Sequence, residues 1–404
     1  MPEQQIVLRN CGRYDPHSLD SYLEKDGFKA LKKARAMTPE QVIAEVKASG
    51  LRGRGGAGFP CGVKWEMTRQ SPGDRKYVIC NADEGEVGTF KDRRIIENDP
   101  FNLVEALAIA GHAIGGSKGF VYLRAEYRRF LPLVRNAIEQ ASNRGLLSPF
   151  ELEVREGAGA YICGEESALM DSIEGRRGEA RFKPPFPPTS GLWGKPTVIN
   201  NVETLMNNTT IISNGATWFS SIGTERSKGT KVFSVAGDVR KPGVYELVMG
   251  SRLKELVSDL AGAINPGLVQ IGGATGRIIP DTMLDTPLAF ENLLGAGAII
   301  VFSKERDIID IVRRTMEFLA EESCGKCAPC REGTAVLAGI MEKFAHSKAE
   351  PRDISNLEIL SRTMAAASLC GLGQAAPTAV TDTLQHFRSA YEGRIRKQPV
   401  GVKA

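Results

Sequence analysis

Along the first half of the chain, apolar and polar residues alternate in a pattern that predicts strands separated by helices. One helix is marked by Thr38, Pro39 and Gln41, because threonine caps a helix, proline suits its first turn and glutamine can complete a capping box. Apolar residues at 42, 43 and 46 give this helix one buried face, and Gly50 ends it. This alternation predicts a layered α/β domain. The other predicted elements are strands at 76–80, 119–124 and 151–154 and helices at 100–114 and 127–143.

The pattern changes near Ser227-Lys228-Gly229. β-branched residues and a turn-forming Pro-Gly pair follow at 231–247, then a helical stretch at 251–262, which together predict a small α+β module. From Glu305 onward the pattern is that of amphipathic helices, which is typical of a helical bundle. We therefore expect three domains, at 1–228, 229–304 and 305–395, and a disordered tail at 396–404. The predicted bundle helices cover 305–323, 334–346, 354–368 and 377–393.

Composition and charge exclude several classes of protein. Apolar residues make up 42% and charged residues 25% of the 404 residues, as in an ordinary globular protein. The net charge of +4 includes no basic block, so neither a nucleic acid nor a lipid surface is implied as a partner. The longest apolar run, Leu293–Phe302, has 10 residues, roughly half of a membrane span, and the N-terminus has no hydrophobic signal segment. We therefore expect a cytoplasmic protein with no direct membrane insertion.

Four cysteines near the C-terminus form the most specific motif of the chain. Cys324, Cys327 and Cys330 follow a C-x-x-C-x-x-C spacing, and Cys370 comes 40 residues later. This spacing lets three thiolates surround one [4Fe–4S] cluster, with the fourth thiolate supplied from a distance. A structural zinc site is the alternative, although such sites usually pair two C-x-x-C knuckles. The sequence therefore predicts one cluster, and since a lone cluster stores single electrons, a second redox group must supply it.

The remaining cysteines are Cys11, Cys61, Cys80 and Cys163. Eight cysteines in 404 residues are too few for a disulfide scaffold. We expect these four to be small buried or half-buried thiols without a redox role. Cys163 is of most interest, because it lies in a loop that also carries candidate binding residues.

A glycine-rich loop at 53–58 matches the pattern G-x-G-x-x-G. The dinucleotide fingerprint requires a strand before this pattern and a helix directly after it, whereas here a helix precedes it and Phe59 follows, so a standard Rossmann turn is not expected. The glycines would still let backbone N–H groups approach a phosphate or a flat ring, and Arg52, Arg54 and Lys64 place positive charge nearby. A flexible surface loop is the plain alternative.

Four further segments carry polar side chains suited to ligand binding, although each is weak alone. Residues 81–86 follow a predicted strand, where α/β sheets place ligands, but the three acids there also suit a solvated loop. Residues 157–166 place glycines before two carboxylates that start a helix, and helix N-termini favour anions. Residues 181–188 form a proline-stiffened strip that could equally be an interaction segment. Asn200 and Asn201 could bond phosphate or polyol oxygens, or merely cap a helix.

Taken together, the segments between residues 50 and 373 resemble one family closely. It is the NADH- and FMN-binding (51-kDa type) subunit family of complex I, NAD-linked hydrogenases and NAD-linked formate dehydrogenases. The resemblance implies an α/β fold with a Rossmann-like FMN/NADH domain, a small α+β ubiquitin-like (SLBB) domain and a C-terminal helical bundle with one [4Fe–4S] cluster. The implied cofactors are FMN, the [4Fe–4S] cluster and NAD(H).

The resemblance also implies which residues hold each group. FMN would be held by Gly53, Arg54, Gly55, Gly56, Ala57, Gly58, Lys64, Asn81, Asp83, Glu84, Asn200, Asn201 and Thr204. The isoalloxazine and the nicotinamide would be lined by Tyr161, Gly164, Glu165 and Glu166, and Leu372 would be a further cofactor contact. The adenine would pack against Phe59 and Phe186, and the dinucleotide would contact Glu86, Glu166 and Lys183. The cluster ligands would be Cys324, Cys327, Cys330 and Cys370.

Some positions depart from the complex I pattern. Complex I members typically have D-E-x-E-P-G where this chain has Asp83-Glu84-Gly85-Glu86-Val87-Gly88, and Met67 replaces an aromatic residue that often contacts the adenine. The segment Cys370–Pro377 and the D-E-G sequence are more similar to the hydrogenase and formate dehydrogenase branch, which we favour. We expect no fused thioredoxin-like or ferredoxin segment. The expected partners are therefore a thioredoxin-like [2Fe–2S] subunit and a larger iron–sulfur or catalytic subunit.

The reaction implied by the resemblance is hydride transfer between NADH and FMN, followed by one-electron transfer to the cluster. Glu84, Glu165 and Glu166 are predicted to act in this step by tuning the flavin charge and the nucleotide affinity. The chain would then be the diaphorase subunit of a soluble or electron-bifurcating complex, and the NADH-binding subunit of respiratory complex I is the alternative. The sequence also leaves open an electron-relay subunit that no longer reacts with nicotinamide, a ferredoxin–NAD or cobalamin reductase subunit, and a zinc-organised structural protein.

Overall fold

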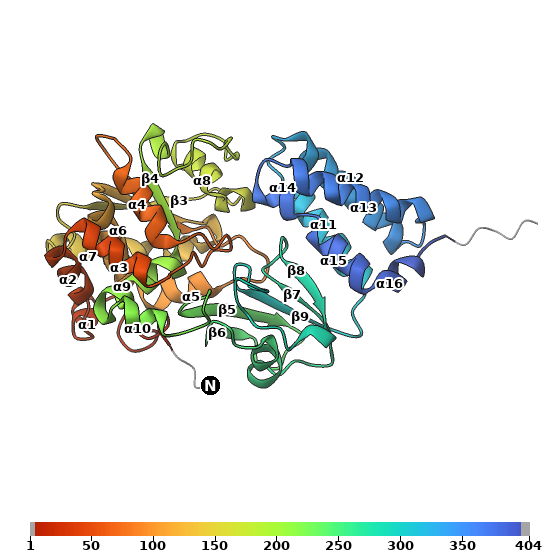
Figure 1. The fold of residues 1–404 in the computed structure, drawn as a ribbon, viewed down its shortest axis with the longest axis horizontal. Coiled ribbons are helices and arrows are strands. Elements are labelled where there is room, and N and C mark those ends of the chain that lie inside the picture. Colours follow the sequence, from red (N-terminus) through yellow and green to blue (C-terminus); the bar gives the residue numbers. More distant parts are fainter. Residues whose placement is uncertain (1–4, 397–404) are drawn as a thin grey trace, which may run out of the picture.

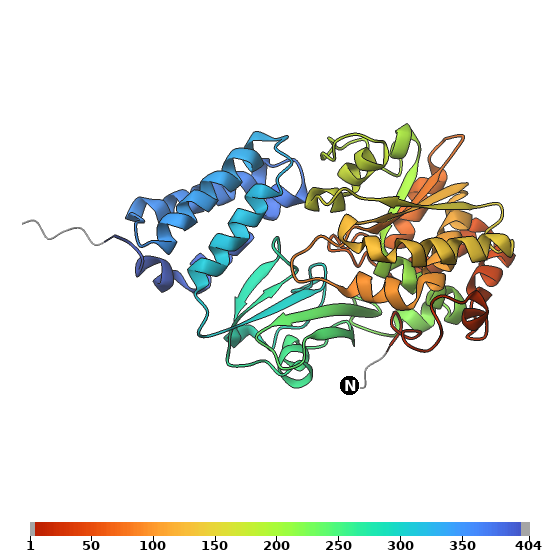
Figure 2. The same ribbon diagram turned by 180° about the vertical axis from the view of Figure 1, so that it is seen from behind.

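The chain folds into two β-sheets and a group of C-terminal helices. The computed structural model describes residues 5–396. In Figure 1 the first sheet and its helices lie at the left, the second sheet lies below the centre, and the C-terminal helices lie at the right. Figure 2 shows the same arrangement from behind.

The first sheet is parallel and has the strand order β3-β2-β1-β4. Its strands are β1 (Tyr77–Ala82), β2 (Lys118–Leu123), β3 (Glu151–Glu156) and β4 (Thr197–Asn201). The first three lie at the predicted positions, whereas β4 was not predicted from the sequence. Because β1 pairs with β2 on one side and with β4 on the other, the order of the strands reverses between β1 and β4. Such a switch point is where parallel sheets bind ligands, at the carboxyl ends of the strands.

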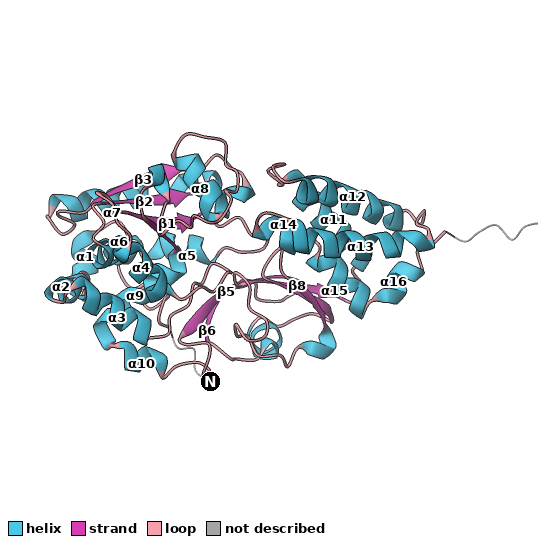
Figure 3. Cartoon of the chain, turned by 45° about the horizontal axis from the view of Figure 1, so that its top comes forward, coloured by secondary structure: helices cyan, strands magenta, loops and turns pink. Residues whose placement is uncertain are grey.

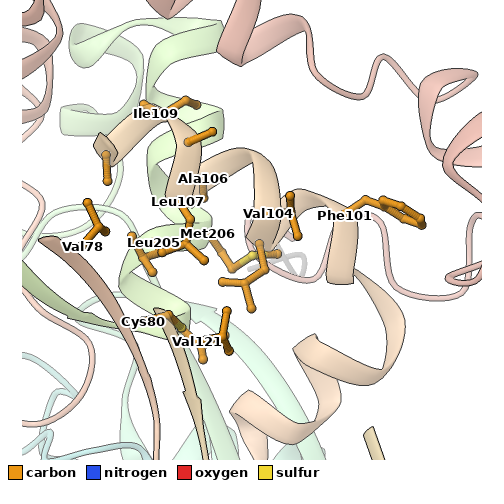
Figure 4. Close-up of a cluster of buried hydrophobic side chains, with 14 of the residues drawn as sticks. Val78, Cys80, Phe101, Val104, Ala106, Leu107, Ile109, Val121, Leu205 and Met206 are labelled. Carbon is orange, nitrogen blue, oxygen red and sulfur yellow. The ribbon is translucent and has the colours of Figure 1, made fainter. Parts of the chain in front are cut away.

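Helices cover both faces of this sheet. Val78 and Cys80 of β1 face one buried cluster, while Ile79 faces another together with Leu169. The helix at 100–114 is buried along every residue except His112. Figure 4 shows its side chains packed between the sheet and a neighbouring helix. The helices are α1 (Leu19–Leu23), α2 (Lys29–Ala36), α3 (Pro39–Ala48), α4 (Cys61–Gln70), α5 (Lys91–Asn98), α6 (Pro100–Ile114), α7 (Leu131–Asn143), α8 (Glu166–Ile173), α9 (Val202–Asn214) and α10 (Ala216–Ser220), with 3-10 turns η1 (Ala125–Phe130), η2 (Tyr161–Gly164) and η3 (Leu192–Gly194).

The predicted start of α3 is confirmed. The Thr38 hydroxyl accepts a hydrogen bond from the Gln41 backbone N–H at 3.2 Å, and the Gln41 side chain accepts one from the Thr38 N–H at 2.8 Å. The predicted helix at 127–143 begins later than expected as an α-helix, because its first turn is η1.

The second sheet is mixed and has the order β6-β5-β9-β7-β8. Figure 3 shows it between the first sheet and the C-terminal helices. β5 pairs antiparallel with β6 and parallel with β9, which agrees with the expected α+β character. Its elements are β5 (Thr230–Gly237), β6 (Gly243–Val248), the helical segment η4 (Glu255–Leu260), β7 (Pro266–Ile271), β8 (Arg277–Pro280), the turn η5 (Asp281–Met283) and β9 (Ala298–Ser303).

The C-terminal part is helical, as predicted, but differs in three details. The helix expected at 377–393 is divided at Phe387, whose backbone φ of −136° lies outside the helical region. In addition, the helix predicted from residue 334 begins at Ala328 and therefore includes Cys330, and the short helix after Cys370 was not predicted. The helices are α11 (Ile308–Glu321), α12 (Ala328–Ala345), α13 (Pro351–Ala367), α14 (Gly371–Ala375), α15 (Thr378–His386) and α16 (Arg388–Glu392).

The limits at 228, 304 and 395 remain predictions as domain boundaries. Arg396, which was placed in the disordered tail, is described, and its backbone N–H donates to the Ala349 carbonyl at 2.7 Å. Residues 397–404 of that predicted tail lie outside the described residues.

The three parts are joined by buried polar contacts. The Glu203 carboxylate of α9 pairs with Lys91 of α5 at 2.9 Å and with Lys231 of β5 at 2.5 Å. Asp382 of α15 accepts hydrogen bonds from the Arg277 side chain and the Ile278 N–H of β8, at 2.7 and 2.9 Å. Because the carboxylates are almost fully buried and paired, they hold the second sheet against both of its neighbours.

Candidate functional site

A cavity of about 460 Å³ lies at the switch point of the first sheet. Asn81 of β1 and Asn201 of β4 are paired in register at the carboxyl ends of these strands, and both line the cavity. The cavity is also lined by residues of the second sheet and of the C-terminal helices. The full lining is Gly55, Gly56, Ala57, Asn81, Asp83, Glu84, Gly85, Glu86, Thr89, Lys91, Asp92, Tyr161, Ile162, Gly164, Glu165, Asn201, Thr275, Ala296, Gly371, Leu372 and Ala375.

The glycine-rich loop forms one wall. Gly55 and Gly56 line the cavity, and a Cβ on Gly55 would lie only 2.9 Å from the Asn201 Cβ, so a larger residue would push into this wall. Gly56 has a φ of +120°, a conformation that favours glycine. Backbone N–H groups of such a loop can approach an anionic or flat ligand closely.

Not every predicted residue of this loop faces the cavity. The Arg54 guanidinium is buried and donates to the carbonyls of Lys228 and Thr230, at 2.5 and 3.0 Å, and its backbone N–H donates to the Thr204 hydroxyl at 2.8 Å. Arg54 and Thr204 therefore anchor the loop from behind. Gly53, Gly58 and Asn200 are also absent from the cavity wall, and the Asn200 side chain accepts a hydrogen bond from the Trp65 indole at 2.9 Å.

Charged side chains gather beside the cavity at the start of α8. Glu165 caps this helix and accepts hydrogen bonds from the backbone N–H groups of Ser167 and Ala168. Lys183 contacts both Glu165 and Glu166, at 2.9 and 2.8 Å, and Lys64 contacts Glu166 at 3.3 Å. Although burial opposes ionisation, the two lysines hold the pKa of Glu166 below its ordinary value. Glu166 is therefore an anion flanked by two cations.

Phe59 and Phe186, which were predicted to pack on the adenine, are exposed by 45% and 50%. The Lys64 ammonium lies 5.9 Å from the centre of the Phe59 ring, so this aromatic lies beside the same charged group. Neither ring lines the cavity, and their contact with a dinucleotide stays a prediction.

Glu84 lines the cavity, but its carboxylate is bonded inside the protein. It accepts hydrogen bonds from the Thr89 and Tyr127 hydroxyls at 2.9 and 2.8 Å and from the backbone N–H groups of Asp92 and Arg93 at 2.9 and 3.0 Å. This arrangement fixes the loop after β1 to the start of α5. The predicted catalytic role of Glu84 stays a prediction.

Two carboxylate oxygens at the cavity suit a hydrogen-bonding ligand. Asp83 Oδ2 and Glu86 Oε2 are buried and have no hydrogen-bond partner within the described residues. Burial raises the pKa of Asp83 to about 7 and also raises the pKa of Glu86. A buried carboxylate oxygen without a partner is costly, so the site fits a ligand that carries N–H or hydroxyl donors, as flavin and nucleotide groups do.

The four predicted cluster cysteines converge on a second, smaller hollow. It is lined by Cys324, Cys327, Cys330 and Cys370, together with mostly apolar residues. The Leu369 backbone N–H points to the Cys327 sulfur at 3.5 Å, and the Ser323 hydroxyl lies 3.3 Å from the Cys330 sulfur. Burial raises the pKa of Cys330 to about 11. Hydrogen bonds to cysteine sulfur are one way in which proteins tune such clusters.

Within residues 5–396, no three His, Cys, Asp or Glu side chains are grouped so that they could hold one metal ion. Four thiols around a common hollow fit a polynuclear cluster better than mononuclear zinc, because the ligands of a cube stand farther apart.

Ile162 and Leu372 line both hollows. Each is only 6% exposed, and both belong to the buried cluster that includes Cys330. The wall between the cavity and the cysteines is therefore apolar and about one side chain thick.

The other four cysteines are free thiols, and Cys61, Cys80 and Cys163 are buried while Cys11 is half-buried. This confirms the expectation of small buried or half-buried thiols.

Comparison with known proteins defines the class. The family model for the Nuo51 FMN-binding domain matches residues 46–209, and the model for the NADH-ubiquinone oxidoreductase-F iron–sulfur binding region matches residues 310–394. The chain is therefore an oxidoreductase subunit that binds FMN, NADH and a [4Fe–4S] cluster. It belongs to the 51-kDa type family of NADH- and FMN-binding subunits, as the sequence motifs predicted.

The relatives come from two kinds of complex. The chain is 43% identical to the NADP-reducing hydrogenase subunit HndC of Solidesulfovibrio fructosivorans, over 98% of this chain and 85% of that protein. It is also 43% identical to an NADH-quinone oxidoreductase subunit of Aquifex aeolicus, over 98% of this chain and 96% of the relative. A crystal structure of an NAD+-reducing [NiFe]-hydrogenase superposes with a TM-score of 0.90 at 40% identity, covering 94% of this chain and 67% of the other.

No helix within the described residues is long and apolar enough to cross a membrane.

Several lining residues were not predicted from the sequence. They include Lys91 and Asp92 of α5, Ile162 of η2, and Thr275 and Ala296 of the second sheet. The signal that could have found Thr275 and Ala296 is the pair of glycine-rich turns at 272–276 and 295–297, which are similar to the first glycine loop in composition.

Proposed function

We propose that this chain is the diaphorase subunit of a multisubunit NAD-linked oxidoreductase, which passes electrons between a nicotinamide dinucleotide and the cluster. The observation that carries the proposal is the shared apolar wall of Ile162 and Leu372 between the cavity and the four cysteines. Bound FMN would supply a group that exchanges electrons in pairs with a nicotinamide and singly with a cluster.

In this proposal the protein binds and orients its ligands. The N–H groups of Gly55–Ala57 would hold anionic groups at one end of the cavity. The Lys64 ammonium, which pairs with Glu166, would add positive charge beside the cavity. Asn81 and Asn201 would bond polar ligand atoms at the strand ends. The anions of Glu165 and Glu166 would disfavour negative charge on a bound flavin, since like charges repel strongly in a site of low dielectric.

We further propose that the complex is of the soluble hydrogenase or formate dehydrogenase type, or an electron-bifurcating one, with a cytoplasmic location. The segment Cys370–Pro377 and the similarity to HndC support this choice. The expected partners are a thioredoxin-like [2Fe–2S] subunit and a larger iron–sulfur or catalytic subunit. The alternative is the NADH-binding subunit of respiratory complex I, which the similarity to the Aquifex aeolicus protein supports equally.

The reaction can be tested on the purified chain loaded with FMN, iron and sulfide under anaerobic conditions. Addition of NADH should bleach the flavin absorbance and produce the paramagnetic signal of a reduced cluster, and ferricyanide should then be reduced. Absence of flavin bleaching would favour the electron-relay subunit. Absence of bound iron, with zinc in its place, would favour the zinc-organised structural protein.

The complex can be identified by purifying the chain from its native cells and naming the subunits that accompany it. Hydrogenase or formate dehydrogenase subunits would support the proposal, and membrane subunits of a quinone reductase would support the alternative. Two relatives of equal identity are named as an NADP-reducing hydrogenase subunit and an NADH-quinone oxidoreductase subunit, so the assay should include both NADH and NADPH.

A further inference from the structure

The loop between α11 and α12 places a serine hydroxyl against one of the four cysteines. Ser323 follows the end of α11 and lines the hollow in which the cysteines converge. Its hydroxyl oxygen lies 3.3 Å from the sulfur of Cys330, which belongs to α12. A polar side chain from outside the cysteine motif therefore contacts a predicted cluster ligand directly.

The other partner of the Ser323 hydroxyl decides which atom donates in this contact. The Gly325 backbone N–H donates to the Ser323 oxygen at 3.3 Å, so this oxygen already serves as an acceptor. A serine hydroxyl has a single proton, which remains available for the Cys330 sulfur. A cysteine that binds a metal does so as a thiolate and has no proton to donate. With a cluster bound, the Ser323 hydroxyl is therefore the donor.

The loop around Ser323 is held on both sides. The carboxylate of the preceding residue, Glu322, accepts a hydrogen bond from the Tyr161 backbone N–H at 3.0 Å. The carbonyl of the following residue, Cys324, accepts one from the Arg177 guanidinium at 2.9 Å. These contacts tie the loop to the segments before and after α8, so the hydroxyl approaches Cys330 from a fixed position.

We propose that the Ser323 hydroxyl raises the reduction potential of the cluster by donating a hydrogen bond to the sulfur of its ligand Cys330. This inference rests on the proposed function, in which the four cysteines hold the cluster. Reduction adds one electron to the cluster, and no proton moves and no bond breaks. Because part of the added negative charge falls on the ligand sulfurs, a donor stabilises the reduced cluster more than the oxidised one. Ser323 is a positioning residue in this sense, since it acts through Cys330.

A side-chain donor can be tested more directly than a backbone donor. The Leu369 backbone N–H, which points to the Cys327 sulfur at 3.5 Å, cannot be removed without altering the course of the chain. The Ser323 hydroxyl can be removed by one substitution. Ser323→Ala deletes the donor, whereas Ser323→Thr keeps it.

Both variants are made in the full chain loaded with FMN and cluster. The midpoint potential of the cluster is measured by anaerobic redox titration, followed by the paramagnetic signal of the reduced form. We expect Ser323→Ala to lower the equilibrium constant for reduction by about tenfold, the order expected for one hydrogen bond to a charged group, which is about 59 mV for a one-electron couple. Ser323→Thr should resemble the wild type. Ser355→Ala, at an exposed position of α13, is the matched control and should leave the potential unchanged.

An unchanged midpoint potential in Ser323→Ala would overturn the proposal, as would an equal fall in Ser323→Ala and Ser323→Thr. Iron content and the unfolding temperature report whether a variant is loaded and folded, and Ser323→Gly, which also removes the hydroxyl, replaces alanine if it is not. Loss of the cluster from both of these variants, with normal loading of Ser323→Thr, would show that the hydroxyl holds the cluster rather than tunes it, and would also overturn the proposal. A wild-type chain without the paramagnetic signal of a reduced cluster would instead contradict the proposed function.

Discussion

Asn81 and Asn201 stand opposite each other in register, at the carboxyl ends of two neighbouring parallel strands. The Asn81 side chain donates to the Gly164 carbonyl at 2.9 Å, and the Asn201 side chain caps α9 by accepting from the Glu203 N–H at 3.0 Å. One pair of amides therefore ties the switch point both to the turn that carries Tyr161 and to the start of α9. These contacts of Asn81 and Asn201 fix the part of the cavity wall that lies at the strand ends.

Replacing Asn201 should weaken both stability and FMN binding. Asn201→Ala removes the cap of α9 and the contact with Asp92, so we expect a loss of about 1–2 kcal/mol in the free energy of unfolding, together with release of FMN on dilution. Denaturant unfolding and flavin fluorescence measure the two effects. Asn143→Ala, at an exposed position of α7, is the matched control and should change neither. Full retention of FMN by Asn201→Ala would contradict this account of the cavity.

Asp83 should make stability depend on pH. Its pKa is raised by burial from an unfolded value of 3.8 to about 7, so the folded state binds this proton more tightly than the unfolded state. The stabilisation is fully present below an unfolded pKa of 3.8 and is lost as the pH rises through the folded pKa of about 7. Between these limits, the unfolding free energy of the wild type should fall by roughly 2–4 kcal/mol relative to Asp83→Asn.

The pH dependence of Asp83 is measured by urea unfolding of the flavin-free protein at several pH values. If the free energy of unfolding depends on pH in the same way for the wild type and for Asp83→Asn, the prediction for Asp83 is wrong.

Glu246 should be essential for attaching the N-terminal segment to the second sheet. Its buried carboxylate accepts hydrogen bonds from the backbone N–H groups of Ile6, Val7 and Leu8 and from the Thr230 hydroxyl. Glu246→Ala leaves these donors unpaired, and we expect a loss of about 3 kcal/mol or more in the free energy of unfolding. Glu225→Gln, at an exposed position, should have no effect. Equal free energies of unfolding for Glu246→Ala and Glu225→Gln would contradict this prediction.

The apolar wall of Ile162 and Leu372 should keep water in the cavity away from the cluster. Ile162→Ala removes a buried side chain that lines both hollows, and we expect about tenfold faster release of iron to a chelator from the flavin-free protein, because water gains access. Ile359→Ala, on the exposed side of α13, controls for the chemical change and should release iron at the wild-type rate. An unchanged rate of iron release from Ile162→Ala would mean that water does not reach the cluster through the cavity.

Removal of a cluster ligand should separate the two redox centres. Cys370→Ala should lower the iron content to well under that of a full [4Fe–4S] cluster, while FMN still binds and NADH still bleaches it. Cys61→Ala, which removes a buried thiol away from this hollow, should keep full iron content. A Cys370→Ala protein that retains the full iron content would exclude Cys370 as a ligand.

Local patterns in the sequence predicted much of the fold. The start of α3, three of the four strands of the first sheet and the helical C-terminal part follow from capping residues and hydrophobic periodicity. β4 and α14 were missed. In β4 the polar residues Asn200 and Asn201 shorten the apolar run, and α14 is only five residues long. The break at Phe387 was missed as well, since apolar periodicity continues across it.

The sequence by itself identified the family and predicted the four cysteines as cluster ligands, because cysteine spacing and glycine-rich motifs are local patterns that can be recognised without knowledge of the fold. Only the tertiary structure decided which way each side chain points. In the folded chain the Arg54 guanidinium points away from the cavity, and the Glu84 carboxylate is hydrogen-bonded within the protein. The Thr275 hydroxyl contacts Glu86, which lies 189 positions earlier in the sequence. The physical reason is that burial and hydrogen bonding depend on which distant segments pack together, and this choice is made by the whole core rather than by any one motif.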